Sequence, residues 1–365
     1  MKKIRITGAA LVVLLWLGLT LGAWFHSPQD FSQAERRKLE QFPDFTAKTV
    51  FSGKFMKKFE DYTLDQFPLR DSFRQLKAGF TYKVLLQRDN NGIYLTQGHG
   101  AKLEYPLNPQ SAQKAVEKFD DIYRTYLKDT GSHVVFSVVP DKSYYLAEKN
   151  GYLAMDYSQL FSIMENGLPW AKYVDLTDSL SEDDYYRTDT HWRQESILGA
   201  AEKLAHALGV EGPRPEDFRK TPLQRPFYGV YYGQAALPME PETMYIMESD
   251  VLDGCTVKNL ENNKTHPVYD LSKEDSKDQY DVFLGGPVSI QVIENPNGPD
   301  RELLVFRDSF GSSLVPLLVQ DYSRVTLIDT RYVPSAYLSR FVDFHGQDVL
   351  MLYSPMVLNQ SSMLK

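Results

Sequence analysis

Ser309 stands where a polar side chain can be used for chemistry. It follows the apolar run 303–306, and Gly311 comes two residues later. An apolar run predicts a buried strand, and ligands of open α/β sheets bind beyond the carboxyl ends of the strands. A serine there has an exposed hydroxyl, and the N–H groups of a following helix could stabilise an oxyanion. The alternative is that Ser309 only caps that helix.

A serine hydroxyl needs a general base, and the base needs a group that fixes its tautomer. Asp189-Thr190-His191-Trp192 supplies both types of residue. In an extended segment, residues two apart point to the same side, so Asp189 could hold the His191 imidazole. The alternative is that Asp189 caps the helix that follows. An acidic residue two positions before a histidine is a weak signal by itself.

The pattern around these residues predicts an α/β fold. Continuous apolar runs, typical of strands buried on both faces, alternate with segments of helical periodicity. Predicted strands cover 133–140, 170–176, 301–311, 324–333 and 348–354, and predicted helices cover 111–129, 194–210 and 312–322. This alternation predicts a sandwich of helices around a mainly parallel sheet.

The remaining segments have weaker patterns. Residues 27–60 are polar and lead into a helix that carries Phe55, Phe59 and Tyr62 at helical spacing. The segment 65–86 continues helically after Pro68, with Leu69, Phe73, Leu76 and Phe80 on one stripe. We interpret both stripes as core faces. Residues 92–98 predict a hairpin strand, and 211–300 is irregular, with strand-like pieces at 280–286 and 288–293.

The N-terminus predicts a membrane segment. Residues 6–25 carry no charge and follow Lys2, Lys3 and Arg5. Twenty residues span about 30 Å of hydrocarbon, and the cations favour a cytoplasmic N-terminus with the rest of the chain outside. A cleaved signal peptide is the competing interpretation, but Leu21 fits a small-x-small cleavage site poorly. A buried globular helix is the third possibility. We expect an uncleaved anchor.

Composition excludes several classes of protein. The chain has 365 residues, 42% of them hydrophobic, and a net charge of −8. The apolar content is too high for a disordered chain, and the acidic balance argues against nucleic-acid binding. Neither a P-loop nor a G-x-G-x-x-G motif is present. Cys255 is the single cysteine, so there is no intramolecular disulfide and no cysteine-rich metal site.

Four segments carry a resemblance to a known family. They are YYRTDTHW (185–192), ELLVFRDSFGSSLVPLLVQDYSRVTLIDTRY (302–332), and DYTLDQFPLRDSFRQLK (61–77) with NNGIYL (90–95). Together they resemble the DHHW family of Gram-positive bacteria, which is related to SGNH-like alginate O-acetylation proteins. The resemblance implies a triad of Asp189, His191 and Ser309, in an order permuted from that of ordinary SGNH hydrolases. It also implies an SGNH-like three-layer α/β/α fold.

The sequence departs from the family pattern at three places. Thr190 takes the second position of the motif, and Arg307 precedes Asp308-Ser309 where the relatives have a small residue or lysine. Pro287 follows FLGG where the resemblance implies asparagine, and a proline donates no backbone hydrogen bond. Loss of one oxyanion donor typically costs about 10²–10³ in rate.

Other residues are candidates for the oxyanion or substrate site. Besides the Ser309 amide, they are Gly285, Gly286, Arg307, Trp192 and Lys142. Arg307, two residues before the serine, could face the same side and hold an anionic sugar or donor. Its alternative is an exposed or salt-bridged arginine, and for Lys142 the alternative is a solvated loop lysine.

We therefore expect three parts: a signal anchor or signal peptide (1–26), a linker and helical stalk (27–84), and an SGNH-like domain (85–365) with an irregular insertion around 211–300. The resemblance implies an extracytoplasmic serine O-acyltransferase or esterase acting on cell-envelope polysaccharide, without metal or organic cofactor. It also implies a membrane-bound O-acyltransferase as partner. The alternative is a non-catalytic envelope protein of this fold that binds glycan or a protein partner. The enzyme requires the Ser309 hydroxyl within about 2.6–3.2 Å of His191.

Overall fold

The computed structural model describes residues 2–32 and 34–365, and of residues 2–5 only the backbone. The chain forms two compact units. The first contains the residues up to Asn91 together with Tyr232–Pro238, and the second contains Gly92–Tyr231 and Met239–Lys365. The side chains of Lys2, Lys3 and Arg5 lie outside the described part, so their charges enter only through the sequence.

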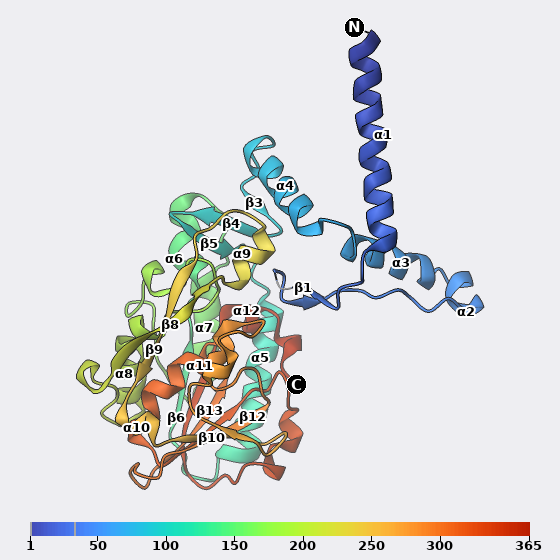
Figure 1. Ribbon diagram of the computed structural model, residues 1–365. Coiled ribbons are helices and arrows are strands. Elements are labelled where there is room, and N and C mark those ends of the chain that lie inside the picture. The colour runs from blue at the N-terminus through green and yellow to red at the C-terminus, as the bar shows by residue number, and fades with distance from the viewer. Residues whose placement is uncertain (1, 33) are drawn as a thin grey trace. The chain divides into compact units, whose positions relative to one another are not determined.

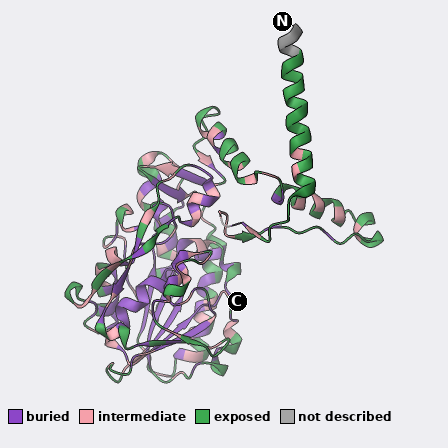
Figure 2. Ribbon diagram, viewed as in Figure 1, coloured by how far each residue is buried: buried purple, intermediate pink, exposed green. Residues whose placement is uncertain are grey.

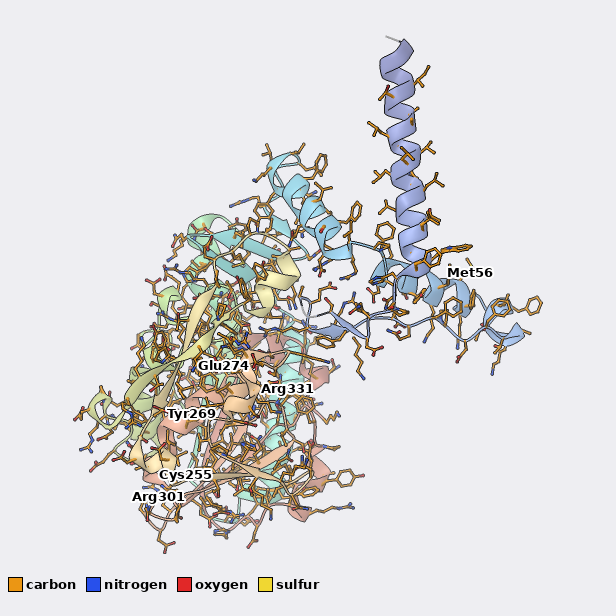
Figure 3. All side chains as sticks on the ribbon, viewed as in Figure 1. Met56, Cys255, Tyr269, Glu274, Arg301 and Arg331 are labelled. Atoms are coloured by element: carbon orange, nitrogen blue, oxygen red, sulfur yellow. The ribbon has the colours of Figure 1, made fainter. Side chains whose placement is uncertain are left out.

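The first unit is mainly helical. Its elements are α1 (Lys2–Phe25), β1 (Phe31–Ser32), β2 (Arg37–Lys38), α2 (Ala47–Phe51), α3 (Lys54–Asp65), α4 (Arg70–Lys83) and β3 (Asp89–Asn90) (Figure 1). Within α1, Ile6–Phe25 is long and apolar enough to cross a membrane, with a mean hydropathy of 2.1 and no buried residue. Figure 3 shows its side chains projecting on all sides of the helix.

The two apolar stripes of this unit are not core faces, contrary to the sequence interpretation. Phe55, Phe59 and Tyr62 on α3 are only half-buried, and they form an aromatic cluster on Phe42 with ring centroids 5.4–6.3 Å away. The stripe on α4 faces outward and is exposed (Figure 2). Few residues of this unit are buried, so its order depends more on polar contacts than on a core.

The second unit is built on an eight-stranded sheet of order β11-β10-β12-β14-β13-β15-β6-β7. The strands are β6 (Val134–Val138), β7 (Lys172–Tyr173), β10 (Thr256–Asn259), β11 (Thr265–His266), β12 (Ile290–Glu294), β13 (Glu302–Arg307), β14 (Arg324–Ile328) and β15 (Asp348–Tyr353). The five strands from β14 to β7 are parallel, while β12, β10 and β11 extend the sheet antiparallel. The mainly parallel sheet is confirmed.

Alternate residues of the central strands enter two separate cores. Leu303 and Val305 face one, and Leu304 and Phe306 face the other. The first core contains α8 (Leu198–Leu208), α11 (Gly311–Leu314) and the 3₁₀ helix η8 (Val315–Asp321). The second contains α5 (Pro109–Ile122), α7 (Tyr157–Gly167) and α12 (Pro355–Asn359). Because both faces are covered, the predicted three-layer α/β/α sandwich is confirmed.

Smaller elements complete this unit. They are the hairpin β4 (Ile93–Thr96) and β5 (His99–Lys102), η1 (Tyr123–Leu127), α6 (Lys142–Leu146), η2 (Glu148–Asn150), η3 (Glu182–Asp184), η4 (Gln194–Ser196), η5 (Pro215–Asp217), β8 (Arg219–Phe227), β9 (Glu242–Glu248), α10 (Asp250–Asp253), η6 (Leu271–Lys273), η7 (Gln279–Val282), η9 (Ser335–Arg340) and η10 (Ser361–Met363). Helix α9 (Val230–Ala235) begins in this unit and ends in the first.

The segment 211–300 differs most from its prediction. It contains the antiparallel pair β8 and β9, whose register shifts between Pro222 and Pro226. The prediction of a strand at 280–286 is wrong, because Gln279–Val282 forms a turn of 3₁₀ helix. The strand predicted at 288–293 is present as β12.

Candidate functional site

Ser309 lies just beyond the carboxyl end of β13, before α11. The Asp308 carboxylate shapes this turn: Oδ1 accepts the Phe310 N–H at 3.0 Å and Oδ2 accepts the Ser354 N–H at 2.8 Å. Gly311 permits a close approach, since a Cβ there would lie 2.8 Å from the Cβ of Arg307. The turn leaves Ser309 half-exposed while its neighbours are buried.

His191 lies between Ser309 and Asp189. Its Nε2 is 2.8 Å from Ser309 Oγ, and its Nδ1 is 2.6 Å from Asp189 Oδ1. The first distance is within the range expected from the sequence, although 118 positions separate the two residues. Nδ1–H donating to the carboxylate leaves Nε2 as the acceptor of the serine proton. This is the arrangement of a nucleophile, a base and an orienting acid.

Asp189 is buried and held by more than its histidine. Oδ1 accepts the His191 N–H at 3.0 Å, and Oδ2 accepts the Val230 N–H at 2.7 Å. Gly229 packs directly on this loop, since a Cβ there would lie 2.3 Å from both Asp189 Cβ and the Thr188 carbonyl oxygen. The position before α9 therefore requires glycine.

Thr188 ties the same loop to β9. Its N–H and its hydroxyl both donate to Oε2 of Glu242, at 2.9 and 3.1 Å, and its Oγ1 accepts the Gly229 N–H at 2.9 Å. The pair β8 and β9 thus helps to position the carboxylate of Asp189.

The His191 ring is fixed by aromatic contacts. Tyr280 stacks on it with ring centroids 3.9 Å apart and planes at 8°, and Phe310 meets it edge-on at 5.2 Å. The Tyr280 hydroxyl bonds Ser313 Oγ at 2.8 Å and donates to the Ser309 carbonyl at 3.4 Å. Tyr280 therefore supports both the His191 ring and the turn that carries Ser309.

Lys142 is buried, which corrects the alternative of a solvated loop lysine. Its ammonium donates to the carbonyls of Gly100, Tyr186 and Arg187, the last two immediately before the Asp189 loop. Burial lowers the pKa of Lys142 to about 7, although Asp189 and other nearby carboxylates favour its charge. The contacts of Lys142 with protein carbonyls indicate a role in positioning the loop.

Arg307 and Trp192 are also buried, so the alternative of an exposed arginine is wrong. Arg307 Nη1 donates to Ser312 Oγ at 3.0 Å, and burial lowers its pKa. Within the described residues its Nε and Nη2 make no hydrogen bond. Trp192 Nε1 donates to Ser313 Oγ at 2.9 Å, so its ring packs under the serine turn.

The predicted glycine donors lie apart from the triad contacts. Gly285 and Gly286 have left-handed backbone conformations, with φ of +72° and +95°. The Gly286 N–H donates to the Phe283 carbonyl at 3.4 Å. A Cβ on Gly285 would meet the His266 ring. Among the contacts of the described residues, neither glycine is bonded to Ser309 or His191.

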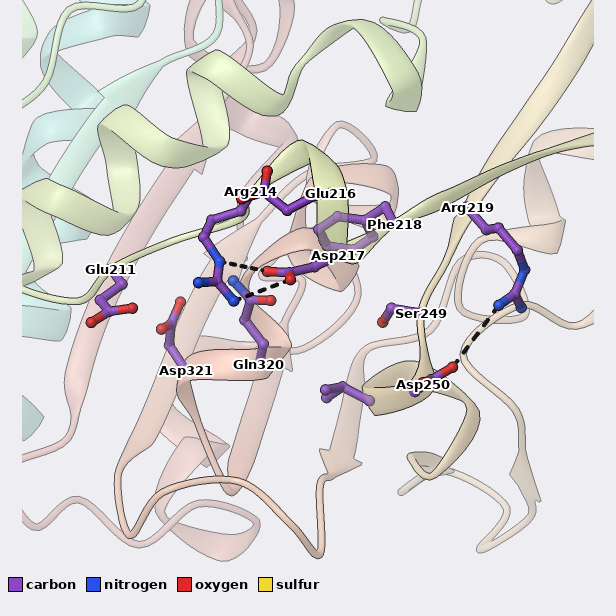
Figure 4. Close-up of a pocket in the computed structure, with 11 residues that line it drawn as sticks. Glu211, Arg214, Glu216, Asp217, Phe218, Arg219, Ser249, Asp250, Gln320 and Asp321 are labelled. Carbon is purple, nitrogen blue, oxygen red and sulfur yellow. Dashed lines mark hydrogen bonds and ion pairs between the residues drawn. The ribbon is translucent and has the colours of Figure 1, made fainter.

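A hollow of about 600 Å³ lies elsewhere on the second unit (Figure 4). Its charged lining is Glu211, Arg214, Glu216, Asp217, Arg219, Asp250 and Asp321. Asp321 precedes β14, whose first residue pairs with the first residue of the parallel strand β13. Ser309 follows the other end of β13, so this acidic hollow is at the opposite edge of the sheet and belongs to a different surface.

Sequence reasoning missed several of these supporting residues. Asp308 carried a signal, because it lies between a buried strand and the candidate serine. Gly229 and Val230 carried none, since they fall in a segment without periodicity. Tyr280 was assigned to a strand.

Comparison with known proteins agrees with this fold. The family described as DHHW protein matches residues 153–328. The resemblance to the DHHW family is confirmed. A crystal structure of a DHHW family protein from Eubacterium siraeum superposes with a TM-score of 0.61 at 20% identity, over 75% of this chain and 94% of that one. Bacillus cereus PatB1, with a sulfonyl adduct, gives 0.58 at 17% identity over 73% and 95%.

A curated relative, the probable alginate O-acetylase AlgJ of Pseudomonas fluorescens, is 25% identical over 55% of this chain. The AlgJ of Pseudomonas syringae pv. tomato is also 25% identical, over 63% of this chain. The chain spans 52% and 61% of the lengths of these two relatives. Both are linked by name to alginate O-acetylation.

Proposed function

We propose that this protein is an extracytoplasmic serine O-acyltransferase or esterase that acts on a cell-envelope polysaccharide. The observation that carries the proposal is the continuous hydrogen-bonded row from Asp189 through His191 to Ser309. If Ser309 only capped the following helix, it would require neither His191 nor the buried Asp189 carboxylate.

In the first step, Ser309 Oγ attacks the carbonyl carbon of an acyl donor while its proton passes to His191 Nε2. Asp189 stabilises the imidazolium that forms, because its carboxylate is 2.6 Å from Nδ1. Collapse of the tetrahedral intermediate breaks the bond to the leaving oxygen, which takes the proton from Nε2. The product is an acyl-serine and a free alcohol.

In the second step, a sugar hydroxyl or a water molecule attacks the acyl-serine. His191 takes its proton at Nε2, and Ser309 Oγ leaves and recovers that proton. Transfer to a sugar gives an acylated polysaccharide, and transfer to water gives a free acid. The same residues therefore support both activities, and access of water to the acyl-serine decides between them.

The oxyanion of each intermediate needs donors. The Ser309 N–H makes no hydrogen bond to the described residues, and we assign it as one donor. Pro287 supplies none from its backbone. With few donors in place, we expect slow hydrolysis of activated esters.

The names of the relatives support the proposed substrate, and the partner is part of the same proposal. Both AlgJ proteins are named as probable alginate O-acetylases, which supports an acetyl group and a polysaccharide. A membrane-bound O-acyltransferase that exports the acyl group is the corresponding partner. The Ile6–Phe25 helix supports attachment to the membrane.

The test uses the full chain in detergent or nanodiscs with an activated acetyl ester. Ser309→Ala and His191→Ala should fall to nearly the same low rate, on the order of 10³-fold or more below wild type, because members of a triad act as a unit. Ser158→Ala, an exposed serine, is the matched control. A sulfonyl fluoride should label wild type and not Ser309→Ala.

Thermal melts must show that the variants fold. Equal esterase rates in wild type and Ser309→Ala would contradict the proposed enzymatic function. The alternative, a protein of this fold that binds glycan or a protein partner, would then remain.

A further inference from the structure

Helix α4 has its apolar stripe on the outside. Leu69 directly precedes the helix in a left-handed conformation, and Phe73, Leu76 and Phe80 on the helix lie within about 60° of one another on a wheel of 3.6 residues per turn. Their exposed fractions are 69%, 40%, 68% and 52%. Val84, Leu85 and Leu86 continue the exposed apolar surface beyond the helix. Soluble proteins rarely leave a contiguous patch of this kind uncovered.

The opposite side of α4 is the one that packs. Ala78 is fully buried and Thr81 nearly so, and Arg74 Nη2 donates to the Gly233 carbonyl at 2.8 Å. The helix therefore contacts its own unit through small and polar side chains. Rotation to bury the stripe would break these contacts, so the orientation is determined by the fold.

The start of α4 lies at the end of the apolar helix α1. A Cβ on Gly22, near the end of α1, would lie 3.4 Å from Pro68. The Gln29 N–H donates to Gln66 Oε1 and Gln66 Nε2 donates to the Gln29 carbonyl, both at 2.8 Å. These contacts hold the segment before α4 next to the point where the chain leaves α1.

Cations flank the stripe. At 100° per residue, Lys77 lies on one side and Lys83 on the other, and both are exposed. Long cationic side chains beside an apolar face can extend to lipid headgroups while their stems cover hydrocarbon. The same surface would attract anionic lipids.

We propose that α4 lies in the membrane interface, with the stripe of Leu69, Phe73, Leu76 and Phe80 inserted among the lipids. The inference rests on the proposed membrane attachment through α1. A second copy of the chain or another protein could cover an apolar stripe, but the contacts between the end of α1 and the residues just before α4 favour lipid, because they place the start of the stripe where the chain leaves the proposed membrane segment.

The experiment measures how deeply two neighbouring positions of α4 lie in the membrane. Leu76→Cys and Gln75→Cys are each made in full-length protein that carries Cys255→Ala, labelled with an environment-sensitive fluorophore and reconstituted in vesicles containing phosphatidylglycerol. Gln75 is exposed and lies about 100° from Leu76. We expect the label at 76 to be blue-shifted and quenched about twofold by lipid-borne nitroxide. The label at 75 should respond mainly to aqueous iodide.

Two outcomes overturn the proposal. Equal quenching by iodide at both positions would show that the stripe faces water. A blue-shifted label at 76 that lipid-borne nitroxide does not quench would show that protein covers it, and cross-linking would identify a second copy.

Retention in the membrane after carbonate extraction, with an intact N-terminus, tests α1 separately. A chain cleaved before the stalk and released from the membrane would overturn both the anchor and the interfacial helix, whereas a retained chain with a water-exposed stripe would overturn only the latter.

Discussion

Asp189 accepts hydrogen bonds from two parts of the chain. His191 bonds it from two positions away, and Val230 bonds it from 41 positions away. The further contact of Asp189 with His191 Nδ1 fixes the tautomer of the imidazole, while the Val230 N–H fixes the carboxylate. A triad of this kind depends on residues that have no chemistry of their own.

Gly229→Ala tests that dependence. The added Cβ would overlap Asp189 Cβ and the Thr188 carbonyl at 2.3 Å, so the loop must shift. A displacement of about 1 Å can cost on the order of 10²-fold in rate, and we expect kcat for an activated ester to fall by about 10–100-fold. Gly254→Ala is the control, because its Cβ would come no closer than 3.5 Å to a neighbour. Unchanged activity in Gly229→Ala would contradict the role of this contact.

Lys142→Met should lower kcat more than it changes KM, because Lys142 binds protein carbonyls beside the Asp189 loop. Lys172→Met, an exposed position on β7, should behave as wild type. Denaturant unfolding of wild type and Lys142→Met should also diverge with pH.

The pKa of Lys142 is lowered to about 7 in the folded chain, below the value of about 10.4 for an unperturbed lysine. The unfolded chain then holds more protons between these pH values, and the stability of wild type relative to the variant should rise from about pH 7 to 10. If the difference in stability between wild type and Lys142→Met did not change across that pH range, Lys142 would not be buried as described.

The proximity of Asp189, His191 and Ser309 could be predicted because their types and local settings are informative. Ser309 ends an apolar strand, and Asp189 and His191 share one side of an extended loop. The supporting residues could not, because Gly229 and Tyr280 act through long-range packing that leaves no periodic pattern.

At the scale of elements, the strands of the parallel sheet were predictable from continuous apolar runs such as 348–354. The pair β8 and β9 was not, since most of β8 is exposed and it contains Pro222 and Pro226. The stripes of α3 and α4 have the periodicity of buried helices. Periodicity identifies an apolar face but does not identify what covers it.

In the first unit, Asp65 connects α3 to the chain that follows α1. Its carboxylate accepts two hydrogen bonds from the Arg37 guanidinium, at 2.8 and 2.5 Å, and one from the Glu40 N–H at 2.9 Å. Arg37 is the main cause of the lowered pKa of Asp65. The contact depends on charge, and Arg37 is partly exposed, so salt screens it.

Asp65→Asn should increase amide hydrogen exchange in residues 28–32, 34–41 and 54–66 at pH 7, with the esterase rate unchanged. A carboxylate whose folded pKa is lowered stabilises above its unfolded pKa and loses this effect as the pH falls. The difference from wild type should therefore shrink below about pH 4. Asp61→Asn, an exposed position on α3, is the control. Equal exchange in wild type and Asp65→Asn at pH 7 would show that the pair adds no order.

At the scale of the molecule, the sequence predicts which side of the membrane the second unit occupies. Lys2, Lys3 and Arg5 precede the apolar Ile6–Phe25 segment, and such cations stay in the cytoplasm. A phosphatase that works only outside the cytoplasm should be active when fused after Lys365. If only a reporter that works in the cytoplasm were active in this fusion, the second unit would lie in the cytoplasm. That result would exclude an extracytoplasmic substrate.

The position of β15 determines when the site can exist. Among the described strands of the sheet it is the last to be synthesised, yet it lies between β13 and β6 and pairs with both. Ser354, directly after it, donates its N–H to the Asp308 carboxylate that shapes the serine turn. A chain that is still emerging from the ribosome cannot join the two halves of its sheet or hold Ser309 in place. The proposed acyl transfer therefore requires that elongation has passed residue 354, and we expect a nascent chain shorter than this to be inert.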